Sequence, residues 1–272
     1  MLFSKFNSNV KEKQIFDYNE NGVTILRKVI SKQWLNNLAV GIEKNFKNPS
    51  KYKCVYEKQG SNELFYDDYC NWQRINEYKD FFLKSNIAKI ASELMQSKKV
   101  NIFHEHVLIK EPGSSKKTPW HQDQPYYCVN GKDNCSMWIP LDYISKDICP
   151  EFIQGSHKWN KKFLPTKFIG DSYDHHDKEF EKIPDIENNK ENYNIISWCL
   201  EPGDLIAFNF ATVHGAPGNN SNIRRRAFSA RFTGMDATYA KRKGETSPPF
   251  PEVCLNHGDK MDCSTFPEIV ID

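Results

Sequence analysis

The pattern of apolar and polar positions changes near Val100. Before it, residues 31–46 carry apolar side chains at helical spacing, and Ser31 is a suitable N-cap for the helix that this predicts. The same part of the chain is expected to hold short helices within 9–20 and 77–96, a strand and turn over 22–30, and an irregular aromatic segment over 47–72.

From residue 100 onward, short apolar and β-branched runs alternate with Gly, Pro and Asn turn signals, which favours a β-sandwich or barrel. Residues 160–193 are polar and aperiodic, so we expect a long loop or lid there. The simplest organisation is one domain over 1–272, with N-terminal helices (1–99), a β core (100–235) and a C-terminal tail (236–272). Strands are expected within 100–113, 119–129, 135–144, 151–157, 194–200, 204–210, 213–216 and 226–234.

Composition narrows the class of protein. A chain of 272 residues with 39% hydrophobic content can bury a substantial core. Its net charge of +2 predicts no strong attraction to nucleic acid or membranes. The first residues, MLFSKFNSNV, do not resemble a signal peptide, and the eight cysteines form no CxxC pair. We therefore expect a cytoplasmic protein, monomer or homodimer, that acts on a small molecule and has no nucleic-acid or membrane partner.

The stretch TPWHQDQPYY, residues 118–127, places His121 and Asp123 two positions apart in an aromatic run. In a strand, residues i and i+2 face the same way, so both side chains could bind one metal ion. His214, on a later apolar strand, is the candidate third ligand. Two histidines and a carboxylate form the facial triad of non-haem iron enzymes. An HxD pair alone is a weak signal, because chance matches are common.

Arg225 follows on the next predicted strand, between Arg224 and Arg226. Strand alternation turns Arg225 to the opposite side from its two neighbours. A buried arginine is costly unless it meets an anion, and its forked guanidinium suits a carboxylate. The alternative is a basic cluster on the surface.

Taken in order, these motifs resemble a known family. The stretch LIKEPGSSKKTPWHQDQPYY is followed by MWIPLDYI, EFIQGSHKW, EPGDLIAFNFATVHGAPGNNS, RRAFSARFTGMDATY and PPFPEV. The series, over about residues 100–255, resembles the phytanoyl-CoA dioxygenase family of iron(II)- and 2-oxoglutarate-dependent oxygenases. The resemblance implies an all-β core with flanking helices, folded as a double-stranded β-helix (a cupin-like jelly roll). It also implies iron(II) on His121, Asp123 and His214, the distal carboxylate of 2-oxoglutarate on Arg225, and Trp138 lining the cosubstrate pocket.

Two further residues match the family less closely. His106 falls where the family has another cosubstrate contact. Lys110 could touch 2-oxoglutarate or an anionic substrate, or could be a solvated lysine at a strand end. One position departs from the family: Ala216 stands where a hydroxyl residue is common near 2-oxoglutarate.

The implied function is hydroxylation. An iron(II)- and 2-oxoglutarate-dependent dioxygenase would use O2 to hydroxylate an unactivated C–H bond of a small polar or anionic metabolite, releasing succinate and CO2. The presence of Asp123 favours hydroxylation over halogenation, because related halogenases carry a small residue there. Two alternatives stay open: a cupin-like metalloenzyme that does not use 2-oxoglutarate and would not need Arg225, and a jelly-roll binding protein without catalysis.

Overall fold

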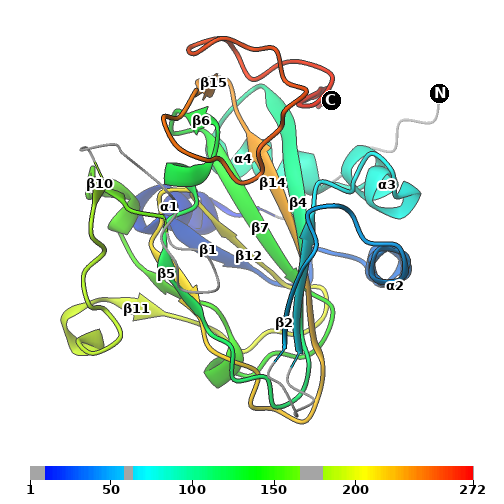
Figure 1. Cartoon of the computed structure of the whole chain (residues 1–272), viewed down its shortest axis with the longest axis vertical. Helices are drawn as coiled ribbons and strands as arrows, with labels where there is room; N and C mark the ends of the chain where they lie inside the picture. The colour runs from blue at the N-terminus through cyan, green and yellow to red at the C-terminus, as the bar shows by residue number, and fades with distance from the viewer. Residues whose placement is uncertain (1–9, 58–63, 166–179, 272) are drawn as a thin grey trace.

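The structure, a computed structural model, describes residues 10–57, 64–165 and 180–271. Its centre is a large antiparallel sheet with the order β1, β12, β7, β14, β4, β3, β2, and β16 also pairs with β4. Figure 1 shows the long strands β4, β14 and β7 side by side. The strands of this sheet are β1 (Val23–Leu26), β2 (Cys54–Glu57), β3 (Leu64–Tyr69), β4 (Val100–Lys110), β7 (Asn134–Pro140), β12 (Leu205–Phe208), β14 (Arg225–Thr233) and β16 (Glu268–Ile269).

A second, smaller sheet has the order β11, β8, β13, β5. An apolar cluster that includes Trp138 of β7, Phe208 of β12 and Phe152 of β8 joins the two sheets. Two facing antiparallel sheets are the jelly-roll core that the sequence predicts. The remaining strands are β5 (Thr118–His121), β6 (Val129–Asn130), β8 (Glu151–Ile153), β9 (Lys162–Phe163), β10 (Phe180–Glu181), β11 (Ile195–Ile196), β13 (His214–Ala216) and β15 (Thr238–Tyr239).

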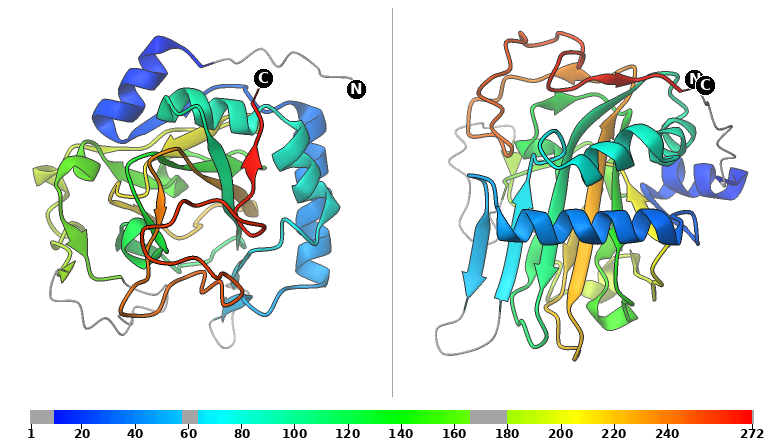
Figure 2. Two further views of the ribbon diagram at one scale, coloured as in Figure 1. Left: turned by 90° about the horizontal axis from the view of Figure 1, so that it is seen from above. Right: turned by 90° about the vertical axis from the view of Figure 1, so that its right-hand side faces the viewer.

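Helices cover the outer face of the large sheet, and α2 crosses its strands in the right-hand view of Figure 2. The hydroxyl of Ser31 accepts a hydrogen bond from the Trp34 amide, which confirms the predicted N-cap of α2. Leu38 and Ile42 of α2 belong to the same buried cluster as Phe228 of β14. The helices are α1 (Glu12–Asn21), α2 (Lys32–Lys47), α3 (Asn76–Lys84) and α4 (Ile87–Met95), with single 3-10 turns η1 (Gln124–Tyr126), η2 (Lys146–Ile148), η3 (Ser156–Lys158) and η4 (Lys190–Asn192).

The expectation of an irregular segment over 47–72 is wrong, because this segment contains β2 and β3. Inward positions of β3 hold Asp67 and Tyr69 as well as Phe65, so the strand lacks the apolar alternation that marks most half-buried strands. The described part of residues 1–99 therefore contributes β1, β2 and β3 to the large sheet as well as four helices. The tail from 236 contributes β16 to the large sheet and β15, which pairs with β6 in a separate sheet.

The expectation of one strand over 119–129 is also wrong. β5 ends at His121, and Asp123 has helical backbone angles at the start of η1. The amides of Asp123 and Gln124 both donate to the carbonyl of Phe210 instead of to a strand partner. Pro125 in η1 has no amide to offer a ladder, so the chain turns at this point.

Three further expectations can be compared with the structure. All eight cysteines are free. In the ranges that the structure describes, no helix is long and apolar enough to cross a membrane. Part of the expected loop over 160–193 is ordered as β9, β10 and η4, while its residues 166–179 lie outside the described residues.

Candidate metal centre and cosubstrate pocket

A cavity of about 650 Å³ lies between the two sheets. One side is formed by inward-facing residues of β2, β3, β4, β7 and β14. The other side is formed by β5, β13 and η1, with residues 245–249 of the C-terminal tail. Every candidate site residue named from the sequence lines this one cavity: His106, Lys110, His121, Asp123, Trp138, His214 and Arg225.

The three candidate metal ligands meet in this cavity. Strand pairing sets His214 of β13 directly opposite His121 of β5, and Asp123 reaches the same point from the turn after β5. One ligand atom from each residue lies within 4.8 Å of the others. The Nε2 atoms of His121 and His214 lie 3.5 and 3.9 Å from Oδ1 of Asp123. Asp123 thus shares a site with His121, but a tight turn places it there, not strand alternation.

The hydrogen bonds of the two imidazoles fix their tautomers. Nδ1 of His121 lies 2.7 Å from the Pro119 carbonyl, and Nδ1 of His214 lies 3.0 Å from the Thr212 carbonyl. A carbonyl can only accept, so Nδ1 of each ring carries a proton. The Nε2 atom of each ring is directed toward Oδ1 of Asp123. Burial, together with His121, lowers the pKa of His214 to about 3, which keeps its ring neutral.

Asp123 is held ionised from several sides. Burial opposes its ionisation, but the hydrogen bond from His121 and the positive charge of Arg231 hold the pKa of its carboxyl well below the usual range. The Tyr126 hydroxyl donates to Oδ1. The Ser136 hydroxyl donates to Oδ2 at 3.2 Å, and Nε of Arg231 lies 3.8 Å from Oδ2. Two imidazole nitrogens and one carboxylate oxygen, all converging, fit a divalent iron ion.

Arg231 has two interpretations from the sequence: a family position near the mouth of the barrel, or a member of a structural ion pair. It is buried on β14 and faces the same way as Arg225, as strand alternation over an even number of positions requires. The even spacing between Arg225 and Arg231 was the sequence signal that both side chains face the cavity. What the sequence could not give is the position of Asp123, which becomes the neighbour of Arg231 only after the chain turns at η1.

Arg225 lies at the opposite end of β14 and is buried, with 5% of its surface exposed. Its guanidinium donates to the Ile148 carbonyl, and burial lowers its pKa to about 10. Its neighbours face the other way, where Arg224 pairs with Glu111 at 2.6 Å and Arg226 pairs with Asp142 at 2.7 Å. The alternative of a surface basic cluster is therefore wrong for Arg225.

Lys110 of β4 is the cross-strand partner of Arg225. It is 1% exposed, so the alternative of a solvated strand-end lysine is wrong. Its ammonium donates to the carbonyls of Lys116 and Pro217 at 2.6 and 2.9 Å. Burial and the charge of Arg225 lower its pKa well below the usual value. Two buried basic side chains at one end of the cavity favour an anion there.

The other named residues lie between these two ends. Trp138 of β7 is opposite Ser229 of β14, and His106 of β4 is opposite the same serine. The ring nitrogen Nε2 of His106 is 3.0 Å from Oδ1 of Asp67, so one of its polar atoms already has a protein partner. The role of His106 as a cosubstrate contact stays a prediction. Ala216 lines the cavity and offers no hydroxyl.

A jelly roll that gathers two histidines and one carboxylate, with buried cations beyond them, indicates the class of mononuclear non-haem iron oxygenases. Within that class the family is shown: the sequence model of phytanoyl-CoA dioxygenase (PhyH) matches residues 18–227, and the chain belongs to this family. It is accordingly a 2-oxoglutarate-dependent dioxygenase that uses iron(II), 2-oxoglutarate and O2. The two alternatives, a metalloenzyme without 2-oxoglutarate and a non-catalytic binding protein, are set aside.

Individual relatives are distant. A probable phytanoyl-CoA dioxygenase of Caenorhabditis elegans is 22% identical over 264 residues, covering 89% of this chain and 82% of the relative. Among solved structures, the α-ketoglutarate-dependent carbocyclase SnoK from nogalamycin biosynthesis superposes with a TM-score of 0.76 at 20% identity, over 96% of this chain and 97% of SnoK. EctD from S. alaskensis, solved with 2-oxoglutarate and 5-hydroxyectoine, gives a TM-score of 0.69 at 17% identity, over 94% of this chain and 88% of EctD. These structures confirm the predicted fold.

Proposed function

We propose that His121, Asp123 and His214 bind the iron(II), that Arg225 and Lys110 hold the distal carboxylate of 2-oxoglutarate, and that the enzyme hydroxylates a C–H bond of a small polar molecule. The observation that carries the proposal is one cavity with a converging two-histidine, one-carboxylate set in it and two buried cations at its far end. Iron(II), when bound with 2-oxoglutarate and O2, supplies the oxidising power to break an unactivated C–H bond while the cosubstrate becomes succinate and CO2.

The protein's own residues prepare the site for this chemistry. Arg225 and Lys110 fix one end of the cosubstrate, so its 2-keto acid end is directed along Trp138 toward the three ligands. The Tyr126 and Ser136 hydroxyls fix the orientation of the Asp123 carboxylate. The ring of Phe152, stacked on His214 at a centroid distance of 5.7 Å, helps to keep water from the centre.

Enzymes with similar folds carry out different reactions, and we favour hydroxylation for this one. Asp123 fills a ligand position, and the EctD structure holds a hydroxylated small molecule, 5-hydroxyectoine. SnoK, by contrast, is described as a carbocyclase. We further propose that residues 1–272 work as one catalytic domain, because the cavity is lined from the N-terminal region, the β core and the C-terminal tail.

The first test needs no substrate. Iron(II) and then 2-oxoglutarate are added to the metal-free protein without O2, and the visible spectrum is recorded. We expect a weak metal-to-ligand charge-transfer band that is lost, or needs far more 2-oxoglutarate, in Arg225→Met. Arg226→Met is the matched control, because that arginine pairs with Asp142 on the outside. Iron binding without any band would contradict the assigned cosubstrate site, and iron binding by His121→Ala with unchanged affinity would contradict the assigned ligands.

A further inference from the structure

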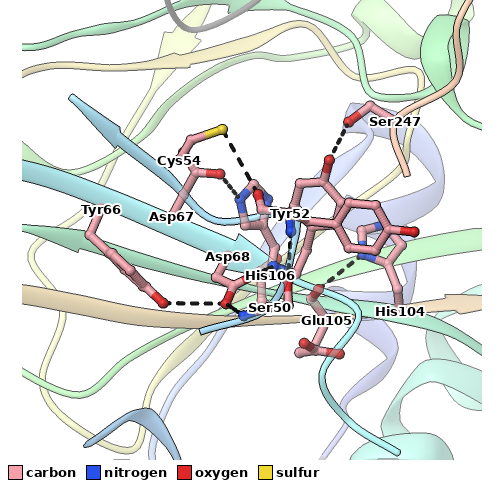
Figure 3. A network of polar contacts seen from close by, with 12 residues as sticks. Ser50, Tyr52, Cys54, Tyr66, Asp67, Asp68, His104, Glu105, His106 and Ser247 are labelled. Atoms are coloured by element: carbon pink, nitrogen blue, oxygen red, sulfur yellow. Dashed lines mark hydrogen bonds and ion pairs between the residues drawn. The ribbon is translucent and has the colours of Figure 1, made fainter. Parts of the chain in front are cut away.

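One wall of the cavity carries hydrogen-bond acceptors that the proposed function does not use. It is formed by the inner faces of β3 and β4, where Asp67 contacts His106 and His104 follows along β4 (Figure 3). Tyr69 is the cross-strand partner of His106. Asp67 and His104 are 3% and 2% exposed. Each has a buried polar atom, Oδ2 of Asp67 and Nε2 of His104, with no hydrogen-bond partner among the residues that the structure describes.

The unpartnered atom of His104 is an acceptor. Its Nδ1 lies 3.0 Å from the Glu105 carbonyl, which can only accept, so Nδ1 carries the proton. Burial and the nearby charge of Arg231 hold the pKa of His104 well below its usual value, so the ring is neutral. Nε2 therefore presents a bare lone pair to the cavity, and a buried acceptor of this kind is costly unless a donor meets it.

Asp67 presents a second acceptor. Its Oδ1 is engaged by Nε2 of His106 at 3.0 Å, which fixes the orientation of the carboxylate. The other oxygen is buried without a partner. Burial raises the pKa of the Asp67 carboxyl, and its hydrogen bond with His106 opposes that rise. Protein interiors seldom leave a carboxylate oxygen unsatisfied, so a ligand that brings a donor to this oxygen would complete the wall.

The surfaces around these acceptors are aromatic. The ring of Tyr69 lies 6.3 Å from that of His104 and 5.5 Å from that of His106, and Tyr52 stacks on Tyr69 at 5.1 Å. Two rings that line the cavity already lie near ammonium groups. Lys51 Nζ lies 5.0 Å from the ring centre of Tyr52, and Lys116 Nζ lies 5.6 Å from that of Tyr56. Such faces attract a cation and repel an anion.

Two of the buried cations of the cavity lie away from this wall. Arg225 and Lys110 are at the cosubstrate end, where both donate to carbonyl groups. Arg231, the cross-strand partner of His104, lies 3.8 Å from the negatively charged Asp123. A substrate carboxylate or phosphate placed at the wall of β3 and β4 would meet two acceptors, Oδ2 of Asp67 and Nε2 of His104.

We propose that the substrate is an amine, received as an ammonium group by Asp67 over the ring of Tyr69, with a second donor such as a hydroxyl or N–H reaching Nε2 of His104. This inference rests on the proposed function and narrows its substrate class from polar or anionic molecules to cationic ones. His106 acts as a positioning residue for Asp67. The carbon skeleton between the two donors then lies along β4 toward the three metal ligands.

The test uses three probes with one ring and different charges: benzylamine, benzyl alcohol and benzoate. Each is titrated without O2 into the protein loaded with iron(II) and 2-oxoglutarate. Perturbation of the charge-transfer band and the rise in melting temperature are both recorded. We expect benzylamine to bind roughly tenfold or more tightly than benzoate, because one charge-assisted hydrogen bond contributes about that factor. Asp67→Asn should weaken benzylamine binding roughly tenfold.

Glu245→Gln is the matched control, since it removes an exposed carboxylate from the lining of the same cavity and should change benzylamine binding little. The inference is overturned if benzoate binds as tightly as benzylamine, if Asp67→Asn leaves benzylamine binding unchanged, or if benzylamine does not bind at about 10 mM. Failure of the proposed function is separate, because it shows as a missing band before any probe is added. The melting-temperature readout then still decides between amine and carboxylate.

Discussion

Arg231 is expected to set the affinity for iron although it does not touch the metal position. Its Nε lies 3.8 Å from Oδ2 of Asp123, and at an effective dielectric constant of about 20 two unit charges at that distance attract by about 4 kcal/mol. In Arg231→Met, Ser136 and Tyr126 still orient the Asp123 carboxylate. The loss in iron affinity should therefore be smaller than the full Arg231–Asp123 attraction. Partners of metal ligands typically contribute about 10- to 100-fold in metal affinity, or about 1.4–2.7 kcal/mol. We expect a loss in that range.

The assay is an anaerobic titration of the metal-free protein with iron(II), followed by the 2-oxoglutarate band. Arg231→Lys keeps the charge and should recover part of the affinity, whereas Arg226→Met, whose partner is Asp142, should bind iron as the wild type does. Equal iron affinity in Arg231→Met and wild type, with both proteins folded by circular dichroism, would refute the idea that this charge supports Asp123.

Three other predictions concern the cosubstrate, the acid range and the core. Lys110→Met should raise the 2-oxoglutarate concentration needed for half-saturation of the band by roughly tenfold or more, since it removes a buried cation beside Arg225; unchanged saturation would contradict its assignment. The pKa of His214 is about 3 in the folded protein and about 6.5 when unfolded, so unfolding takes up a proton between these values and stability falls as the pH falls through this window. Urea unfolding of the metal-free protein should therefore show a loss of about 2 kcal/mol from this group between pH 7 and pH 5, reduced in His214→Gln, and an equal loss in both proteins would refute the assignment. Phe228→Ala should lower the free energy of unfolding by about 3–5 kcal/mol, because its fully buried ring packs on Tyr78, Phe81 and Phe82 at 4.8–6.1 Å on the outer face of the sheet. The iron affinity of that folded variant should be unchanged, and a large change would contradict the separation of the core from the site.

Much of the fold could be read from local pattern. The helical spacing over 31–46 and the N-cap Ser31 predicted α2, which begins at Lys32 as observed. β-Branched runs between turn signals predicted β4, β7, β12 and β14, because apolar side chains on a strand must be buried on one or both faces. The order of motifs, more than any single one, predicted the family and its cavity.

The wrong predictions concern segments in which polar side chains are buried or in which remote contacts set the backbone. β3 was missed because its inward face carries Asp67 and Tyr69, which line a cavity instead of an apolar core. The break after His121 was missed because a turn stabilised by the Phe210 carbonyl, a residue remote in sequence, cannot be seen in the local alternation.

The sequence by itself determined the set of chemical groups: two histidines and an aspartate in a fixed order, and an arginine on a strand that turns it inward. Only the tertiary structure decided which of these groups meet. Pairing of β5 with β13 brings His121 to His214, and pairing of β14 with β4 brings Arg225 to Lys110. The physical reason is that period and propensity act between near neighbours along the chain, whereas the register between remote strands is set by burial of both sheets together. In one wall of the cavity, Oδ2 of Asp67 and Nε2 of His104 have no hydrogen-bond partner among the described residues.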